Sequence, residues 1–296
     1  MQYIHKPIIV IVGQTASGKS ALAIKVAELF GGEIICADSR TIYKGMDIGT
    51  AKPSAQDRQK VPHHGLDLIE PTEYFSAAAF KDYAAQKVDE IQSRGKLPLI
   101  VGGTGLYIDG YVYDYSFAGE ADRLQRAELE ALSLAELQAR ARAMGIGETQ
   151  IDFKNHRHLS RAVERGNITP ERHPLPAHVL IIGLKLDREQ LLERITNRVD
   201  TMFAMGFMQE VQNLVRTYGN DATGLLTPGY TAARRYLLGK VTLEEAKEEF
   251  KRSDRSLAKR QLTWFKRNQD IVSVHSDTQA IDTIRAFLLM FDTIDL

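Results

Sequence analysis

The stretch that decides the fold covers residues 13–20 and reads Gly-Gln-Thr-Ala-Ser-Gly-Lys-Ser. The apolar residues 8–12 precede it, and the helix-forming residues 21–24 follow it. A strand, a glycine-rich turn and a helix in this order form a P-loop, whose backbone N–H groups converge on phosphate oxygens. We expect Lys19 to add a full positive charge there and the Ser20 hydroxyl to bind Mg²⁺. The sequence therefore predicts a site for a diphosphate or a triphosphate.

Composition limits the class of protein. The 296 residues are 44% hydrophobic, enough to bury a core, and the formal net charge is zero. Any nucleic-acid binding would therefore rest on local clusters of basic residues. The single cysteine, Cys36, follows two isoleucines, so we expect a buried strand thiol in a reducing compartment. Residues 1–6 lead straight into the first strand and no apolar run reaches membrane-spanning length. We expect a monomeric, cytoplasmic protein with no signal peptide and no membrane partner.

Short apolar runs alternate with helical patterns, which is typical of a parallel sheet covered on both faces. A helix is expected over residues 76–94, in the long connection before the third strand. The predicted strands are residues 7–12, 33–36, 97–101, 178–185 and 271–274.

The connection after the third strand is too long for a simple crossover. It is rich in Ala, Leu, Glu and Arg, which are strong helix formers. We interpret residues 113–153 as a small helical insertion in a catalytic core made of residues 1–112 and 154–296. The later part of the core, residues 187–270, is almost wholly helical in pattern. The prediction is an α/β fold with a P-loop NTPase-like parallel sheet flanked by helices, a helical insertion and a helical C-terminal part.

The residues that follow two of the predicted strands indicate a ligand site at one edge of the sheet. Asp38 comes directly after the second strand, and strand ends in such sheets border the ligand crevice. Asp38 is therefore expected to face whatever the P-loop holds, with a helix cap or turn aspartate as the alternative. After the third strand, Gly102, Gly103 and Gly105 predict close backbone approach to a ligand, and Thr104 adds a hydroxyl.

A further segment, residues 42–53, reads Ile-Tyr-Lys-Gly-Met-Asp-Ile-Gly-Thr-Ala-Lys-Pro and follows Asp38 closely. It resembles the signature of the tRNA dimethylallyltransferases, the tRNA isopentenyltransferases of bacterial type. Residues 62–67, 102–107 and 261–265 resemble further segments of that family in the same order. The resemblance covers nearly the whole chain apart from the insertion.

The resemblance implies a reaction that the P-loop alone does not indicate. In this family the loop holds the diphosphate of dimethylallyl diphosphate, and the dimethylallyl group passes to N6 of adenine 37, next to the tRNA anticodon. The implied catalytic residues are Asp38 as general base, Thr104 at the reacting centre and Arg198 as a charge clamp, with Mg²⁺ on Ser20. The implied diphosphate-binding residues are Gly13, Gln14, Thr15, Ala16, Ser17, Gly18, Lys19 and Ser20.

Two other functions fit the same P-loop. In a small-molecule kinase the loop would hold ATP, and Asp38 would orient an acceptor hydroxyl. In a non-catalytic RNA-binding module the loop would be vestigial. Apart from the resemblance, Arg198 would be interpreted as an exposed helix arginine.

Residues 251–267 are rich in lysine and arginine. At about 100° per residue, four of these side chains fall within a helical stripe about 60° wide. Phe250, Leu257 and Trp264 lie on nearly the opposite face, which is expected to face the core. The single sign of the stripe favours contact with RNA phosphates over a merely solvated face, with Asp254 as the exception. We call this set the basic stripe: Arg252, Arg255, Lys259 and Lys266.

Further segments resemble parts of the family that contact the tRNA anticodon stem-loop. Residues 38–41 align with a loop that contacts the target adenine. Residues 157–164 resemble an arginine-rich helix that contacts the anticodon loop, although His158 stands where arginine is usual. Arg126, in the shortened insertion, matches an RNA-contacting position. Outside the basic stripe the implied tRNA contacts are Asp38, Ser39, Arg40, Thr41, Arg126, Arg157, His158, Leu159, Ser160 and Arg161.

Overall fold

The computed structural model describes residues 6–117, 123–148, 151–166 and 172–291. The chain divides into two compact units. The core consists of residues 1–112 and 175–296, and the helical unit consists of residues 113–174. The helical unit begins where the sequence predicts and extends beyond the predicted end at residue 153.

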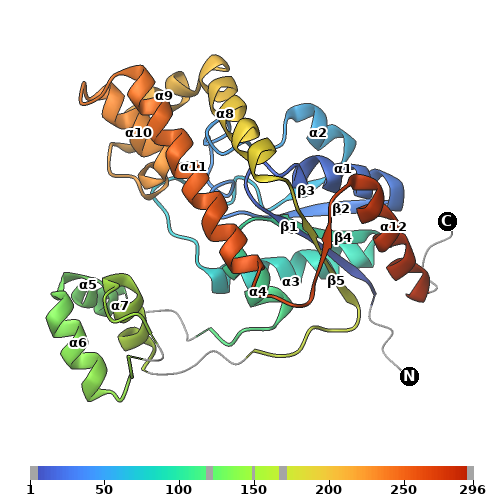
Figure 1. Cartoon of the computed structure of the whole chain (residues 1–296), viewed down its shortest axis with the longest axis horizontal. Helices are drawn as coiled ribbons and strands as arrows, with labels where there is room; N and C mark the ends of the chain where they lie inside the picture. Colours follow the sequence, from blue (N-terminus) through green and yellow to red (C-terminus); the bar gives the residue numbers. More distant parts are fainter. Residues whose placement is uncertain (1–5, 118–122, 149–150, 167–171, 292–296) are drawn as a thin grey trace. The chain divides into compact units, whose positions relative to one another are not determined.

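Within the described residues, six parallel strands form one sheet in the order β3-β2-β4-β1-β5-β6 (Figure 1). All five predicted strands are confirmed. The short β3 is not predicted by the sequence, because its two histidines carry no apolar alternation. The strands are β1 (Ile8–Gly13), β2 (Gly32–Ala37), β3 (His63–His64), β4 (Leu97–Gly102), β5 (Val179–Leu184) and β6 (Ile271–Val274).

Helices cover both faces of the sheet, so its central strands are apolar on both sides. On one face, Ile9 and Ile11 of β1 pack in a buried cluster with apolar residues of α1 and α12. The single thiol, Cys36, is buried in the same cluster, as predicted. The helices of the N-terminal half and the last helices are α1 (Lys19–Phe30), α2 (Ala55–Lys60), α3 (Ala77–Ser93), α4 (Gly105–Val112), α12 (Asp277–Leu288) and the 3₁₀ turn η2 (Leu289–Phe291).

The C-terminal helices form a second apolar cluster beside the sheet. Phe207 and Phe250 lie in it, with Met46 and Tyr43 from the loop after β2. This cluster anchors that loop to the helices, which matters for the site described below. The helices are α8 (Arg188–Ala204), α9 (Phe207–Tyr218), the 3₁₀ turn η1 (Thr223–Leu226), α10 (Pro228–Leu237) and α11 (Leu243–Phe265).

The helical unit has its own small core. Its helices are α5 (Arg123–Ala131), α6 (Leu134–Ala143) and α7 (His156–Arg165). Leu159 and Val163 of α7 pack with Leu129 and Leu137 of the other two helices. The sequence places residues 154–174 in the core, whereas the structure places them in the helical unit. The packing of α7 explains this difference. Residues 154–165 show an apolar face in the sequence, but no local pattern predicts which helices pack against it.

Candidate active site

The P-loop lies at the carboxyl end of β1, the strand between β4 and β5. Ala16 (φ 61°) and Gly18 (φ 94°) adopt left-handed conformations, and helix α1 begins at Lys19. A left-handed alanine is unusual for a residue with a side chain, and such strain is concentrated at functional loops. The Ser17 hydroxyl is buried and has no hydrogen-bond partner among the described residues. The loop therefore has an unsatisfied polar group beside the positive end of a helix, as a phosphate site requires.

Charged side chains converge on Lys19. Its amine donates a hydrogen bond to the Gln14 carbonyl over 3.3 Å. Burial lowers the pKa of Lys19 to about 8, against the opposing field of Asp38. Arg198 lowers this pKa further, while Asp254 raises it. Two cations and two carboxylates thus act on one another at the mouth of the P-loop, so their charges balance and the two cations stay close to the P-loop.

Asp38 and Thr104 meet at the same edge of the sheet. Asp38 follows β2, and its carboxylate accepts a hydrogen bond from the Arg40 N–H over 2.9 Å. The Thr104 hydroxyl, just after β4, accepts one from the Ser39 N–H over 3.0 Å. The Thr104 N–H in turn donates to the Ala37 carbonyl over 3.3 Å. The two predicted polar groups are therefore joined through backbone contacts and lie beside the P-loop strand.

Asp254 is a site residue that the sequence analysis misses. It is fully buried, and its carboxylate lies 2.5 Å from Arg198 Nη2 and 3.7 Å from Arg40 Nη1. Arg198 Nε and Asp254 Oδ1 are buried and have no hydrogen-bond partner among the described residues. Arg198 is therefore held by a carboxylate with one donor still available for an anion. The signal in the sequence is that Asp254 interrupts the basic stripe, since a buried acid needs a basic partner.

The glycines after β4 approach the chain itself and not a ligand, which corrects the expectation for them. A Cβ on Gly102 would lie 2.0 Å from the Ala37 carbonyl oxygen. A Cβ on Gly103 would lie 2.2 Å from Gln261, and one on Gly105 2.3 Å from Trp264. These glycines let β2 and helix α11 pack tightly against the loop that carries Thr104.

The face of α11 opposite the basic stripe is only partly a core face. Phe250 is buried as predicted, but Leu257 is half-buried and Trp264 is 40% exposed. The Trp264 indole N–H donates to the Asp109 carboxylate over 2.8 Å, so the ring needs a polar partner at the surface of α4. Within the basic stripe all four side chains are exposed, as a nucleic-acid surface requires: Arg252, Arg255, Lys259 and Lys266.

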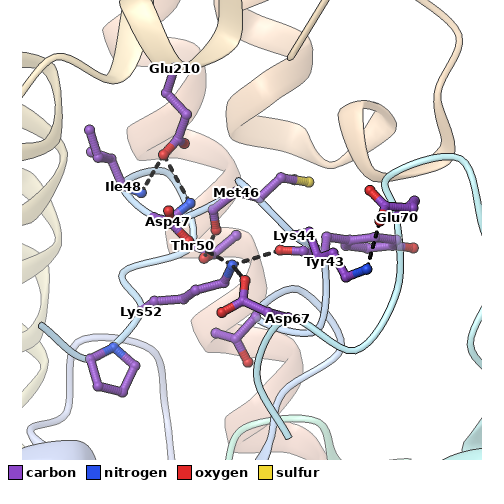
Figure 2. Close-up of polar contacts among 12 residues, drawn as sticks. Tyr43, Lys44, Met46, Asp47, Ile48, Thr50, Lys52, Asp67, Glu70 and Glu210 are labelled. Atoms are coloured by element: carbon purple, nitrogen blue, oxygen red, sulfur yellow. Dashed lines mark hydrogen bonds and ion pairs between the residues drawn. The ribbon is translucent and has the colours of Figure 1, made fainter. Parts of the chain in front are cut away.

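The distinctive loop after β2 is held by a buried lysine, Lys52, and a half-buried glutamate, Glu210 (Figure 2). The Lys52 side chain is 1% exposed, and its amine contacts the Tyr43 carbonyl at 2.6 Å and the carboxylates of Asp47 at 2.7 Å and Asp67 at 2.5 Å. From α9, the Glu210 carboxylate accepts three successive backbone N–H groups of the loop. The Lys52 ammonium is thus matched by two carboxylates, which is the condition for burying a charge.

Glu210 ties this loop to the C-terminal helices. It accepts from the N–H groups of Asp47 (2.9 Å), Ile48 (2.6 Å) and Gly49 (3.1 Å), and from the Tyr230 hydroxyl (2.6 Å). Burial and the neighbouring carboxylate raise the pKa of Tyr230, so its hydroxyl stays a donor. The loop after β2 therefore has a fixed shape from Tyr43 onward, close after Asp38 and Arg40.

Replacing Glu210 by alanine is expected to destabilise the fold by about 2–3 kcal/mol, because several donors lose a charged acceptor at once. Denaturant unfolding of the variant and the wild type measures this loss. Glu244→Ala is the control, since that side chain is 77% exposed and forms a surface ion pair with Lys247 at i+3. The control is expected to stay within about 0.5 kcal/mol. An equally small change for Glu210→Ala would show that the loop does not depend on this carboxylate.

The sequence-predicted tRNA contacts differ in exposure. Ser39 and Arg40 are half-buried, whereas Thr41 is buried and its hydroxyl donates to the Asp38 carbonyl over 3.3 Å. Thr41 thus supports the loop and does not present its side chain to RNA.

In the helical unit, His158 is exposed and Arg161 forms ion pairs with Glu164 and Glu130. Leu159 and Ser160 are buried in the packing of the unit, so their side chains face its interior. The side chains of Arg126 and Arg157 lie outside the described residues.

The described residues contain no group of three or more His, Cys, Asp or Glu side chains placed to hold a metal ion. Ser20 is exposed in the first turn of α1 and offers one hydroxyl. Mg²⁺ commonly takes one or two protein ligands and completes its shell with water and phosphate oxygens. The donor set at the P-loop therefore fits an ion held jointly with a phosphate-bearing ligand. No helix in the described ranges is both long and apolar enough to cross a membrane.

Known proteins resemble this chain in both sequence and fold. A family model described as IPP transferase matches residues 41–268. A tRNA dimethylallyltransferase of Pelotomaculum thermopropionicum is 41% identical over 283 residues, which cover 90% of each chain. The full-length tRNA isopentenylpyrophosphate transferase of Bacillus halodurans has a TM-score of 0.76 and 34% identity, covering 97% of this chain and 98% of that one.

A eukaryotic dimethylallyltransferase acting on tRNA has a TM-score of 0.77 and 25% identity. The structural match covers 97% of this chain and 79% of the eukaryotic protein. The family match covers residues 41–268, which include Thr104, Arg198 and Asp254. On this agreement of sequence, fold and site, the chain belongs to the IPP transferase family.

Proposed function

We propose that this protein transfers the dimethylallyl group of dimethylallyl diphosphate to N6 of adenine 37 in tRNA and releases diphosphate. The observation that carries the proposal is the meeting of a P-loop with Asp38 and Thr104 at one sheet edge, in a chain of the IPP transferase family. A phosphate site beside a carboxylate suits a reaction in which a diphosphate leaves and a proton is removed.

The diphosphate would be held by charge and by backbone donors. The P-loop N–H groups and the dipole of α1 face its oxygens, and Lys19 and Arg198 neutralise them. Arg198, whose Nη2 is held by Asp254, would offer its remaining guanidinium donors to the ligand. Negative charge on the diphosphate grows as the carbon–oxygen bond breaks, so these fixed groups bind the transition state more strongly than the substrate.

Ser20 would hold Mg²⁺ through its hydroxyl. When bound there, it supplies further positive charge to the leaving group. The protein itself would position the diphosphate: the P-loop orients it, and Lys19 and Arg198 fix its position.

The exocyclic amine of adenine is a weak nucleophile. As its nitrogen bonds to the first carbon of the dimethylallyl group, the carbon–oxygen bond breaks and its electron pair stays on the diphosphate. Asp38 takes the proton that the amine loses. Thr104, held against Ser39, would hydrogen-bond at the reacting centre. A base within a helix or loop must leave its stack to reach this position, as in other enzymes that act on bases.

tRNA would bind along the exposed basic stripe of α11. Further contacts are proposed for Ser39, Arg40, Arg126, Arg157, His158 and Arg161. The stripe and the buried face of α11 belong to one helix, so RNA phosphates and the diphosphate site contact opposite sides of the same element. We place the reaction in the cytoplasm and propose that the protein acts as a monomer.

Neutralising the basic stripe is expected to weaken tRNA binding while leaving diphosphate affinity unchanged. Each lost phosphate contact lowers the slope of log affinity against log salt by about 0.7–0.9. The measurement is tRNA affinity at several salt concentrations for the wild type and the four-fold glutamine variant. A charge-matched control replaces four exposed basic residues elsewhere in the core: Lys25, Lys60, Lys96 and Arg285. Equal slopes and affinities for all three proteins would reduce the stripe to a solvated surface.

A comparison of the two possible substrates distinguishes the proposed transferase from a kinase. Purified protein is titrated with dimethylallyl diphosphate and with ATP, each in the presence of Mg²⁺, and turnover of each is followed with tRNA present. The proposal expects dimethylallyl diphosphate to be consumed only when tRNA is present, with no requirement for ATP. Phosphate transfer from ATP to a small acceptor, with no consumption of dimethylallyl diphosphate, would favour the kinase.

A further inference from the structure

Gln261 of α11 connects two loops of the site. Its side chain is buried, with 8% of the residue exposed. The side-chain oxygen accepts a hydrogen bond from the Thr15 N–H of the P-loop over 2.7 Å. The side-chain nitrogen donates to the Gly103 carbonyl, in the loop that carries Thr104, over 3.0 Å. One buried amide thus bridges the phosphate-binding loop and the loop after β4.

The surroundings fit this amide closely. A Cβ at position 103 would lie 2.2 Å from Gln261 Nε2, so only glycine admits the side chain there. One turn earlier on α11, the Ala258 carbonyl accepts a hydrogen bond from the Gln14 side chain over 3.0 Å. The P-loop is therefore bonded to two successive turns of α11, at Ala258 and Gln261. Gln261 also bonds to Gly103 at the end of β4.

We propose that Gln261 is a positioning residue that sets the spacing between the P-loop and the Thr104 loop. The proposal rests on the proposed function, in which the P-loop holds the diphosphate and the Thr104 hydroxyl lies at the reacting centre. The Thr104 loop is in turn bonded to the loop that carries Asp38, through the Ser39 N–H. Transfer requires both partners at near-contact distance, and a misplacement of about 1 Å can cost about 100-fold in rate.

A side-chain amide meets both requirements of the bridge at any pH. Thr15 presents a donor and Gly103 presents an acceptor, so the bridging group must accept on one side and donate on the other. Methionine has nearly the same shape and can do neither. An ionised glutamate can accept from Thr15 but opposes the Gly103 carbonyl, whereas a protonated glutamate can make both bonds. Burial raises the pKa of such a carboxyl, which brings its protonation into an accessible pH range.

The test compares Gln261→Met and Gln261→Glu with the wild type. We expect Gln261→Met to lower kcat about 100-fold while the KM for dimethylallyl diphosphate and the affinity for inorganic pyrophosphate change much less, because the P-loop itself stays intact. For Gln261→Glu, kcat relative to the wild type is expected to rise as the pH is lowered, as the carboxyl gains its proton. The same ratio for Gln261→Met should not change with pH.

Thr242→Ala is the control for a purely structural effect. Thr242 caps the start of the same helix, far along it from Gln261, by accepting from the Glu245 N–H. This variant is expected to lower Tm without changing kcat. A folded Gln261→Met enzyme with wild-type kcat, or equal pH profiles for the two Gln261 variants, would overturn the positioning role. Absence of transfer by the wild type itself would instead reject the proposed function.

Discussion

Replacing Asp38 by asparagine is expected to slow dimethylallyl transfer by about 10²–10⁴-fold, the usual contribution of a general base. Asparagine can still accept the Arg40 N–H that Asp38 accepts at 2.9 Å, so the loop keeps its shape. It cannot remove a proton from the adenine amine. Single-turnover transfer with enzyme in excess measures this step without product release.

Pyrophosphate affinity gives the second half of this prediction. Asp38 contributes negative charge near Lys19 and is not a phosphate ligand, so its neutralisation should leave pyrophosphate binding intact. Asp282→Asn is the matched control, because that exposed carboxylate forms a surface ion pair with Arg285 at i+3. Near wild-type single-turnover rates for Asp38→Asn would show that another group takes the proton.

Replacing Lys19 by methionine is expected to weaken pyrophosphate binding and to slow transfer by about 10²–10³-fold. This is the typical cost of removing one group that stabilises the charge of a transition state. Arg198→Met is expected to act in the same direction, since its guanidinium is held toward the same charge by Asp254. Both quantities fall together because each cation contacts the diphosphate before and during bond breaking. Lys25→Met, an exposed lysine on the same helix, is the control.

The pH dependence of binding follows from the lowered pKa of Lys19. In the ligand-free protein its amine is charged below about pH 8 and neutral above that value. The advantage of the wild type over Lys19→Met in pyrophosphate affinity should therefore be largest below pH 8 and shrink as the pH rises. An affinity ratio that does not change between pH 6.5 and about 9.5 would place the titrating amine elsewhere.

The fold follows from the sequence wherever apolar runs have flanking signals. β1 is bounded by the P-loop, and α10 begins at Pro228, a proline that favours the first helical turn. β3 escapes prediction because it is only two residues long and its residues, His63 and His64, show no apolar alternation. The end of the helical unit escapes as well, since the partners of α7 are chosen by packing and not by any local pattern.

The site is predictable where one residue does one chemical task. Lys19, Asp38 and Thr104 are found from motif and strand position. Asp254 and Gln261 are not, because each acts on partners far away in the chain. The glycines after β4 show the same limit: the sequence indicates that something approaches them closely, but only the fold shows that α11 and β2 do so.

The central claim is tested most directly by the product. Purified protein is incubated with Mg²⁺, isotopically labelled dimethylallyl diphosphate and unmodified tRNA, in the absence of ATP and GTP. One part of the tRNA is then digested to nucleosides to identify the labelled base, and another to oligonucleotides to locate it. The account predicts that the label appears in a single N6-dimethylallyl adenosine from the position next to the anticodon, with one diphosphate released for each group transferred. Unlabelled tRNA, under conditions where a relative of the same family labels it, would contradict the account.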